Sequence, residues 1–251
     1  MTSTKETSKR QARREQMRRK GQRNRLIGIG FISAVVSLVV FLIIYSNYYK
    51  PTGDVAAGDV MAAEPQSYPQ ADKTALGDPN ASVRIDAYED FQCPACVNYT
   101  KETEPLIIKN LVAAGKVYYV FHNYPFIDGP GAGSNGESDQ AASASMCAAE
   151  QNKFWEMHAT IFANWNGENK GGYSDQRLTA FAEKAGLDMT AFNACFKANK
   201  YKAEIQADFD GGNTAGVQGT PSIFVNGTFV KPGYVPSYDD VLKAVETALA
   251  K

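Results

Sequence analysis

The sequence has little histidine, little cysteine and only one long uncharged apolar run. Its 251 residues include two histidines and four cysteines. No segment matches a phosphate-binding glycine loop, a dinucleotide-binding fingerprint or a Ser/His/Asp set. No internal repeat is visible, and a single apolar run excludes a protein with several membrane spans. The composition, with 44% hydrophobic and 21% charged residues, also excludes general disorder and a collagen-like fibre.

Charge is distributed unevenly along the chain, although the formal net charge is only −1. Residues 1–25 carry 10 of the 26 Lys and Arg residues. From residue 46 onward, 16 basic residues stand against 25 acidic ones, so the C-terminal bulk is acidic. An acidic domain is a poor partner for nucleic acid, and we expect no nucleic-acid binding there.

The uncharged run covers residues 26–45 and reads LIGIGFISAVVSLVVFLIIY. Twenty helical residues span about 30 Å, the hydrocarbon thickness of a bilayer, so we expect a transmembrane helix. The basic tail, residues 1–25, then stays in the cytoplasm next to anionic lipid, and the rest of the chain lies outside. The alternatives are a cleaved signal peptide and nucleic-acid binding by the basic tail. The run is longer than a signal-peptide core, and no small-residue cleavage site follows it.

Residues 46–74 mix Pro, Gly, Ala and single charges without apolar periodicity, which is typical of a flexible linker. Residues 75–251 are expected to form one domain. Strand patterns cover 83–91 and 116–126, and the segment between them is helical in periodicity up to Gly115. A strand, a helix and a further strand indicate a parallel βαβ unit.

After this unit the pattern is helical for about 70 residues. Two short strands around an Asn226-Gly227 turn and a closing helix complete the chain. The sequence therefore predicts an α/β fold in which an α-helical insertion, at about residues 135–205, interrupts a sheet.

Cys93-Pro94-Ala95-Cys96 stands at the predicted junction of strand and helix. A thiol at a helix N-terminus faces unpaired N–H groups and the positive end of the helix dipole, which favour the thiolate. The second sulfur lies one turn further on, so we expect Cys93 to be the exposed nucleophile and Cys96 the shielded resolving thiol. Pro94 has no N–H to lose in the first turn.

Two other interpretations of this motif are half of a zinc site and a purely structural bridge. Cys147 and Cys195 would have to complete the zinc ligands. They lie far apart in the chain rather than in a second CxxC motif, which favours the redox interpretation.

Three segments together resemble the DsbA-like thiol–disulfide oxidoreductases of the membrane-anchored bacterial kind. They are DPNASVRIDAYEDFQCPAC, CAAEQNKFWEMHATIF and GVQGTPSIFVNG. The resemblance covers the chain from about Leu76 to its end. It implies a thioredoxin-like fold with an inserted α-helical domain, and an active-site disulfide that faces a groove between the two parts.

The resemblance also implies that Thr220–Pro221 is a cis peptide beside the Cys93–Cys96 pair. The cis bond would turn the backbone of Thr220 toward the sulfurs, where it can pair with a substrate strand. From the residues alone, an ordinary trans proline at the start of an edge strand stays open.

Two positions depart from the family pattern. Family members often carry a buried glutamate six residues before the nucleophile, where this chain has Ala87. Glu89 lies on the same strand face and either relays the proton of Cys96 in its place or is an exposed charge. Ala95 stands where the most oxidising relatives have histidine. Without that cation we expect a reduction potential below that of the strongest oxidants.

Cys147 and Cys195 fall in the helical insertion among apolar neighbours. Outside the membrane an even cysteine count favours pairing, so we expect a structural disulfide. Buried free thiols and a second redox pair are the alternatives. His122 and His158 are expected to be satisfied core or surface groups rather than metal ligands or bases.

Taken together, these patterns predict a single-pass membrane enzyme whose extracytoplasmic domain introduces disulfides into exported proteins. A substrate thiolate attacks Cys93, and a second substrate thiolate resolves the mixed disulfide. No cofactor or metal is needed, and reoxidation requires a quinone-linked membrane partner. The alternatives are a reductase or isomerase with the same site, and a non-catalytic peptide-binding module.

Overall fold

The computed structural model describes residues 17, 37–40, 58–129 and 136–250. The predicted basic tail and transmembrane helix lie outside the described residues apart from Met17 and the helical residues 37–40. None of the helices in the described part has the length and apolar character required to cross a bilayer. The chain divides into two units, Met1–Pro51 and Thr52–Lys251, and the second contains the whole sheet.

A five-stranded sheet with the order β1-β3-β2-β4-β5 forms the centre of the second unit. The strands are β1 (Ala75–Leu76), β2 (Val83–Glu89), β3 (Val117–Asn123), β4 (Ser222–Val225) and β5 (Thr228–Val230). Only β2 and β3 are parallel, and the other three pairings are antiparallel. The predicted βαβ unit is therefore present, since a parallel pair needs a crossover connection.

The crossover from β2 to β3 is not the continuous helix that its periodicity predicts. It consists of α2 (Pro94–Glu102), α3 (Glu104–Ile107) and the π-helical turn η1 (Ile108–Val112). The break falls at Thr103, which precedes Pro105 by two residues. Proline has no N–H to donate, so it favours the first turn of a new helix over the interior of a long one.

Strand β2 places alternate residues in the core. Val83, Ile85, Ala87 and Glu89 are all buried, whereas Arg84 is exposed. Such a period of two is what a strand with one covered face requires. Glu89 lies on the same face of the strand as the three apolar residues, and its side chain is therefore buried in the core.

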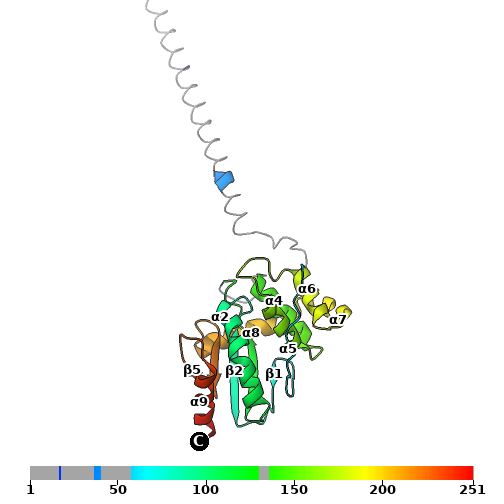
Figure 1. The fold of residues 1–251 in the computed structure, drawn as a ribbon. Coiled ribbons are helices and arrows are strands. Elements are labelled where there is room, and N and C mark those ends of the chain that lie inside the picture. Colours follow the sequence, from blue (N-terminus) through cyan, green and yellow to red (C-terminus); the bar gives the residue numbers. More distant parts are fainter. Residues whose placement is uncertain (1–16, 18–36, 41–57, 130–135, 251) are drawn as a thin grey trace, which may run out of the picture. The chain divides into compact units, whose positions relative to one another are not determined.

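Among the described residues between β3 and β4, five helices are present: α4 (Glu137–Ala149), α5 (Phe154–Ala163), α6 (Asp175–Lys184), α7 (Met189–Lys197) and α8 (Lys202–Ala215). Helices α4 to α7 gather together, away from the C-terminal helix α9 (Tyr238–Leu249) (Figure 1). The last of these helices ends at Ala215.

Helix α8 is held against β3 by Asp208. Its carboxylate accepts the backbone N–H of Asn123 at 3.0 Å and lies 3.1 Å from Nδ1 of His122. On its other side, Nε2 of His122 is 2.8 Å from Asp86. Burial alone would lower the pKa of His122, but the hydrogen bonds to Asp208 and Asp86 outweigh it and raise that pKa to about 9. His122 thus joins two strands and a helix.

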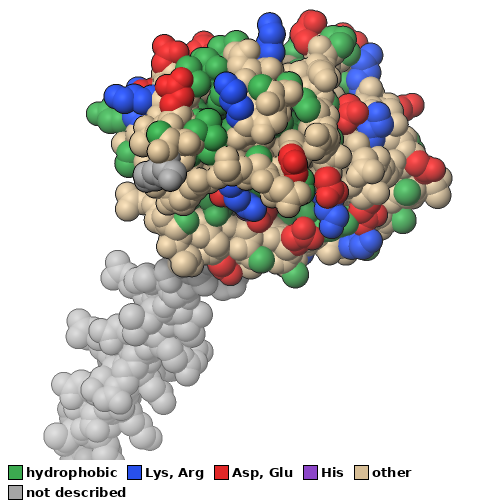
Figure 2. Space-filling model, turned by 90° about the horizontal axis from the view of Figure 1, so that it is seen from below, with side chains coloured by type: hydrophobic (Ala, Val, Ile, Leu, Met, Phe, Trp, Pro, Cys, Tyr) green, Lys and Arg blue, Asp and Glu red, His purple; other side chains and the backbone are tan. Residues whose placement is uncertain are grey.

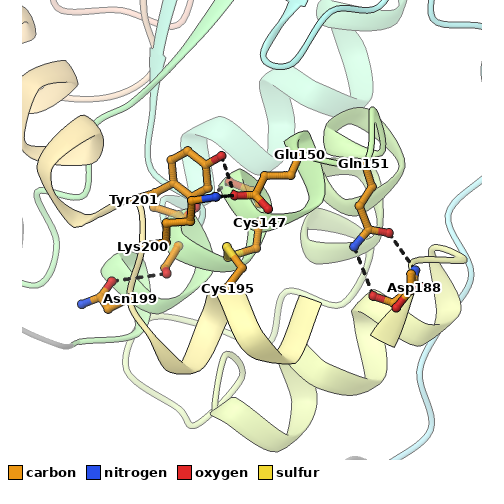
Figure 3. The surroundings of a disulfide bond; sticks show 11 residues. Cys147, Glu150, Gln151, Asp188, Cys195, Asn199, Lys200 and Tyr201 are labelled. Carbon is orange, nitrogen blue, oxygen red and sulfur yellow. Dashed lines mark hydrogen bonds and ion pairs between the residues drawn. A yellow bond between two sulfur atoms is a disulfide. The ribbon is translucent and has the colours of Figure 1, made fainter. Parts of the chain in front are cut away.

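Cys147 of α4 and Cys195 of α7 form a disulfide with a Cα–Cα distance of 5.8 Å (Figure 3). Polar contacts flank it on both sides. Glu150 pairs with Lys200 and accepts the Tyr201 hydroxyl, and Gln151 exchanges two hydrogen bonds with the backbone of Asp188. The bridge therefore ties together two helices of the insertion.

The surface shown in Figure 2 carries acidic and basic side chains interspersed over the domain. On that face the Lys and Arg side chains do not form a continuous patch.

Candidate active site

The turn from β2 into α2 carries the first cysteine. Cys93 is the N-cap residue of α2, with φ −71° and ψ 121°, and Pro94 occupies the first turn. The N–H of Cys93 donates to the carbonyl of Asp90 at 3.0 Å, which closes the turn. The expected strand-to-helix junction is therefore present, with the thiol at the helix N-terminus.

A buried carboxylate organises this turn. Asp90 is 1% exposed and accepts hydrogen bonds from the backbone N–H groups of Gln92 and Ile127 and from the Ser138 hydroxyl, at 2.8, 3.0 and 2.6 Å. Trp165 donates its indole N–H to the Gln92 carbonyl at 2.7 Å. Since Ser138 and Trp165 belong to the inserted region, that region fixes the turn that bears Cys93.

The two thiols of the pair have opposite electrostatic preferences. The Cys96 thiol, the Thr220 side chain and the backbone N–H groups of Cys96 and Ala95 lower the pKa of Cys93 to about 6 against the opposing effect of burial. Burial raises the pKa of Cys96 well above its ordinary value, and the neighbouring Cys93 and Glu89 raise it further. A single negative charge on the pair is therefore favoured on Cys93.

Cys93 is less exposed than the sequence suggests. Its exposed fraction is 5%, and that of Cys96 is 0%. The cause is the segment before β4, where Thr220–Pro221 is a cis peptide. The Cys93 thiol donates to the Thr220 carbonyl at 3.2 Å, so this segment covers part of the sulfur. The structure thus brings Cys93, Cys96, Thr220 and Pro221 together.

Titration of the reduced protein tests this asymmetry. We expect thiolate absorbance to appear with a midpoint near pH 6, because the thiolate of Cys93 accepts hydrogen bonds that the thiol cannot use. Below that midpoint the charge is lost. A Cys93→Ser variant is the control, and it should lose this phase entirely. A first midpoint near 8.5, the ordinary value for cysteine, would contradict the assignment.

Glu89 is not an exposed charge. It is 1% exposed, and neither of its carboxyl oxygens has a hydrogen bond of good geometry. Burial raises its pKa well above the ordinary value, and the charges of Glu104 and Cys93 add to this, while the Cys96 thiol opposes them. Burial in the core therefore disfavours the charged form of Glu89.

Two further ionisable residues lie next to Glu89. Glu104 was not singled out from the sequence, and the expectation that His158 is a satisfied group is wrong, because its buried Nε2 has no hydrogen-bond partner. Glu104 is 4% exposed, and His158 is 2% exposed. Together with Glu89 they form a group whose ligating atoms lie within 4.8 Å of one another, and these residue types could hold a metal ion. The available signal for Glu104 was one acid at the start of the apolar stretch EPLIIKNLV.

The site pairs an ionisable thiol with a shielded one, and it lies on a thioredoxin-like sheet that carries a helical insertion. This combination defines a thiol–disulfide oxidoreductase of the thioredoxin fold. Residues 70–247 match the family described as Thioredoxin, and the chain belongs to this family. The family resemblance stated from sequence motifs is thereby confirmed: the chain is a DsbA-like protein disulfide oxidoreductase.

Known proteins are similar to this chain over most of its length. The probable disulfide bond formation protein D of Bacillus anthracis is 24% identical over 233 residues, which cover 91% of this chain and 98% of that protein. Oxidised BdbD from Bacillus subtilis superposes with a TM-score of 0.63 at 21% identity, covering 76% of this chain and 100% of the other. DsbA from Chlamydia trachomatis superposes with a TM-score of 0.60 at 20% identity, covering 74% of this chain and 98% of the other. These structures confirm the thioredoxin-like fold with its helical insertion.

Proposed function

We propose that this enzyme introduces disulfides into exported proteins through the Cys93–Cys96 pair. The observation that carries the proposal is the asymmetry of the two thiols. Cys93 lies at a helix N-terminus with a pKa of about 6, and burial raises the pKa of Cys96 well above the ordinary value. A stabilised Cys93 thiolate stabilises the reduced form, which makes the disulfide a better oxidant.

The reaction begins on the oxidised pair. A substrate thiolate attacks the Cys93 sulfur, and Cys96 leaves. A second substrate thiolate then attacks the substrate sulfur of the mixed disulfide and releases Cys93 as a thiolate. The carbonyl of Thr220, 3.2 Å from the Cys93 sulfur, marks where an extended substrate backbone would pair beside the reacting atoms. Pro94 and Ala95 supply the turn between the sulfurs, and Ala95 adds no cation.

The proposed location follows from the N-terminal sequence. A tail with 10 basic residues followed by 20 uncharged ones supports a single span at residues 26–45, with the tail in the cytoplasm. Residues 46–74 would then act as a linker, and the domain would work outside the membrane. A quinone-linked membrane partner would reoxidise Cys93–Cys96 by meeting the tethered domain in the plane of the bilayer.

The reduction potential separates this function from a reductase or isomerase that uses the same residues. Equilibration of the full-length protein with glutathione buffers is expected to give a potential in the oxidising half of the known range, roughly −120 to −230 mV. Because Ala95 carries no positive charge, we expect the reduction potential to lie below the upper limit of this range. A potential well below about −250 mV would contradict the oxidase assignment and favour the reductase.

A further inference from the structure

Three buried ionisable side chains from separate elements meet at one place in the core. Glu89 ends β2, Glu104 begins α3 and His158 lies within α5, a helix of the insertion. Their ligating atoms all lie within 4.8 Å of one another, and none of the three residues is more than 4% exposed. The group therefore joins elements of the sheet part to the insertion.

Several polar atoms of this group have no partner. Both carboxyl oxygens of Glu89 and Nε2 of His158 are buried, and none of them has a hydrogen bond to a described residue. Buried polar groups in folded proteins are nearly always paired, so three unpaired atoms in one place are unusual. Atoms of this kind are typical of a place where an ion or a water molecule binds.

Asn123 adds a fourth side chain with the same property. It ends β3 and is the register partner of Glu89 in the parallel pair of β2 and β3. Side chains paired in this way lie on the same face of the sheet, on backbones about 4.8 Å apart. Asn123 is 1% exposed, and neither polar atom of its amide has a hydrogen-bond partner in the described part of the chain. Asn123 therefore points independently to a ligand beside Glu89.

The two carboxyl groups also lack a cationic partner. Within residues 58–129 and 136–250, no Lys or Arg forms an ion pair with Glu89 or Glu104. The hydroxyl of Tyr119 donates to Glu104 Oε1 at 3.3 Å. Buried carboxylates are costly unless they are paired or coordinate a metal, and one divalent cation would make two of them electrically neutral.

The donor types select zinc among the divalent cations. Mg²⁺ and Ca²⁺ prefer oxygen ligands throughout, whereas an imidazole nitrogen together with carboxylate oxygens suits Zn²⁺. Zinc bonds of about 2.0–2.2 Å place tetrahedral ligand atoms about 3.3–3.6 Å apart. His158 Nε2 and Glu104 Oε1 are 3.8 Å apart, so a small shift brings these two atoms to that separation.

We propose that one Zn²⁺ ion binds in this group, with Glu89, Glu104 and His158 as ligands. The amide oxygen of Asn123 completes a four-coordinate site. Because all four residues are buried, the site is closed and structural. Both carboxyl groups bind as carboxylates, so uptake of the ion releases any proton that they carry. The ion would tie the ends of β2 and β3 and the start of α3 to the insertion, and it does not depend on the function proposed above.

The metal content of the purified full-length protein tests the site. The chain is produced with zinc in the medium, and loose ions are removed with a chelator. It is measured in the oxidised state, because Cys93 and Cys96 then form a disulfide and cannot bind metal. We expect about one zinc per chain by elemental mass spectrometry. Glu104→Gln, which keeps the shape but removes a charged ligand, should retain less than about a tenth of that amount.

Two further variants define the expected pattern. Glu102→Gln removes an exposed carboxylate two residues from Glu104, and it should keep the wild-type zinc content. Tyr119→Phe removes only the hydroxyl that donates to Glu104, and it should weaken zinc binding about tenfold or more, because that hydroxyl orients a ligand.

Two measurements on the wild-type protein do not depend on the folding of any variant. Cobalt in place of zinc should give the visible absorption of a four-coordinate ion, without the near-ultraviolet band of a cobalt–thiolate bond, since all the ligand atoms are nitrogen or oxygen. Refolding with zinc at about 100 times its Kd should raise Tm by about 5–10 °C.

A wild-type protein that holds no zinc and has the same Tm with and without the ion would overturn the proposal. The buried atoms would then be paired by water and by protons. A wild-type zinc content in folded Glu104→Gln would overturn it as well, because the ion would then bind elsewhere. A cobalt–thiolate band from the oxidised protein would have the same meaning.

Discussion

A Cys93→Ser variant is expected to reduce disulfide formation in a reduced, unfolded substrate to the uncatalysed rate. The hydroxyl of serine can neither form a disulfide nor leave as a stabilised thiolate. Cys96 cannot substitute for Cys93, because it is 0% exposed and its pKa is raised well above the ordinary value. The measurement is the rate of thiol loss in the substrate, with the full-length protein supplied in its oxidised state.

The matched control for this prediction is Cys96→Ser, which keeps the nucleophile and removes the resolving thiol. This variant should form long-lived mixed disulfides through Cys93 that are visible on a non-reducing gel, and trapping them in the membrane fraction would identify natural substrates. Retention of catalysed disulfide formation by Cys93→Ser would show that the motif has only structural value. Catalysis would then lie elsewhere in the protein.

Replacing Cys147 and Cys195 together with alanine is expected to lower the free energy of unfolding by about 4 kcal/mol. The disulfide closes a loop of 48 residues, and the chain-entropy model gives about 3 kcal/mol for 15 residues and about 4.7 kcal/mol for 100. This is a large part of the roughly 5–15 kcal/mol that stabilises an ordinary domain. Denaturant unfolding of the variant and the wild-type protein measures the difference.

The same double variant should keep its exchange activity at a temperature where it is still folded. The bridge joins α4 to α7, whereas the redox pair lies at the start of α2. Single Cys147→Ala is the control, and it should be about as destabilising as the double variant because either change removes the bond. Loss of exchange in the folded double variant would instead support a second redox pair that passes electrons to Cys93–Cys96.

The redox motif could be interpreted from the sequence because its chemistry is local. Cys93, Pro94 and Cys96 are within one helical turn, and the strand pattern before them places this turn at a helix N-terminus. The same applies to the βαβ unit and to the helical insertion, whose periodicities are visible in short windows. The N-terminal span stays a prediction that follows from the same kind of local pattern.

The continuity of the helix after Cys93 was predicted wrongly because periodicity outweighed a single proline. The apolar spacing continues across Thr103, but Pro105 begins a new helix there. The sequence allowed Glu89 to be either a proton relay or an exposed charge, although Glu89 lies on the same face of β2 as the buried residues Ile85 and Ala87. The alternation of residues along a strand shows which side chains share a face, but how deeply they are buried depends on what packs over that face.

The sequence by itself indicated the α/β class, the CxxC motif at a strand-to-helix junction and the helical insertion, since each depends on residues close together in the chain. The thioredoxin-like class followed from the resemblance of three motifs to a known family. Tertiary structure alone decided that Glu104 and His158 meet Glu89 in a buried cluster. His158 is 69 residues beyond Glu89 in the chain, and no local pattern records such a distance. Ionisation depends on burial and on neighbouring charges, and both are properties of the packed fold.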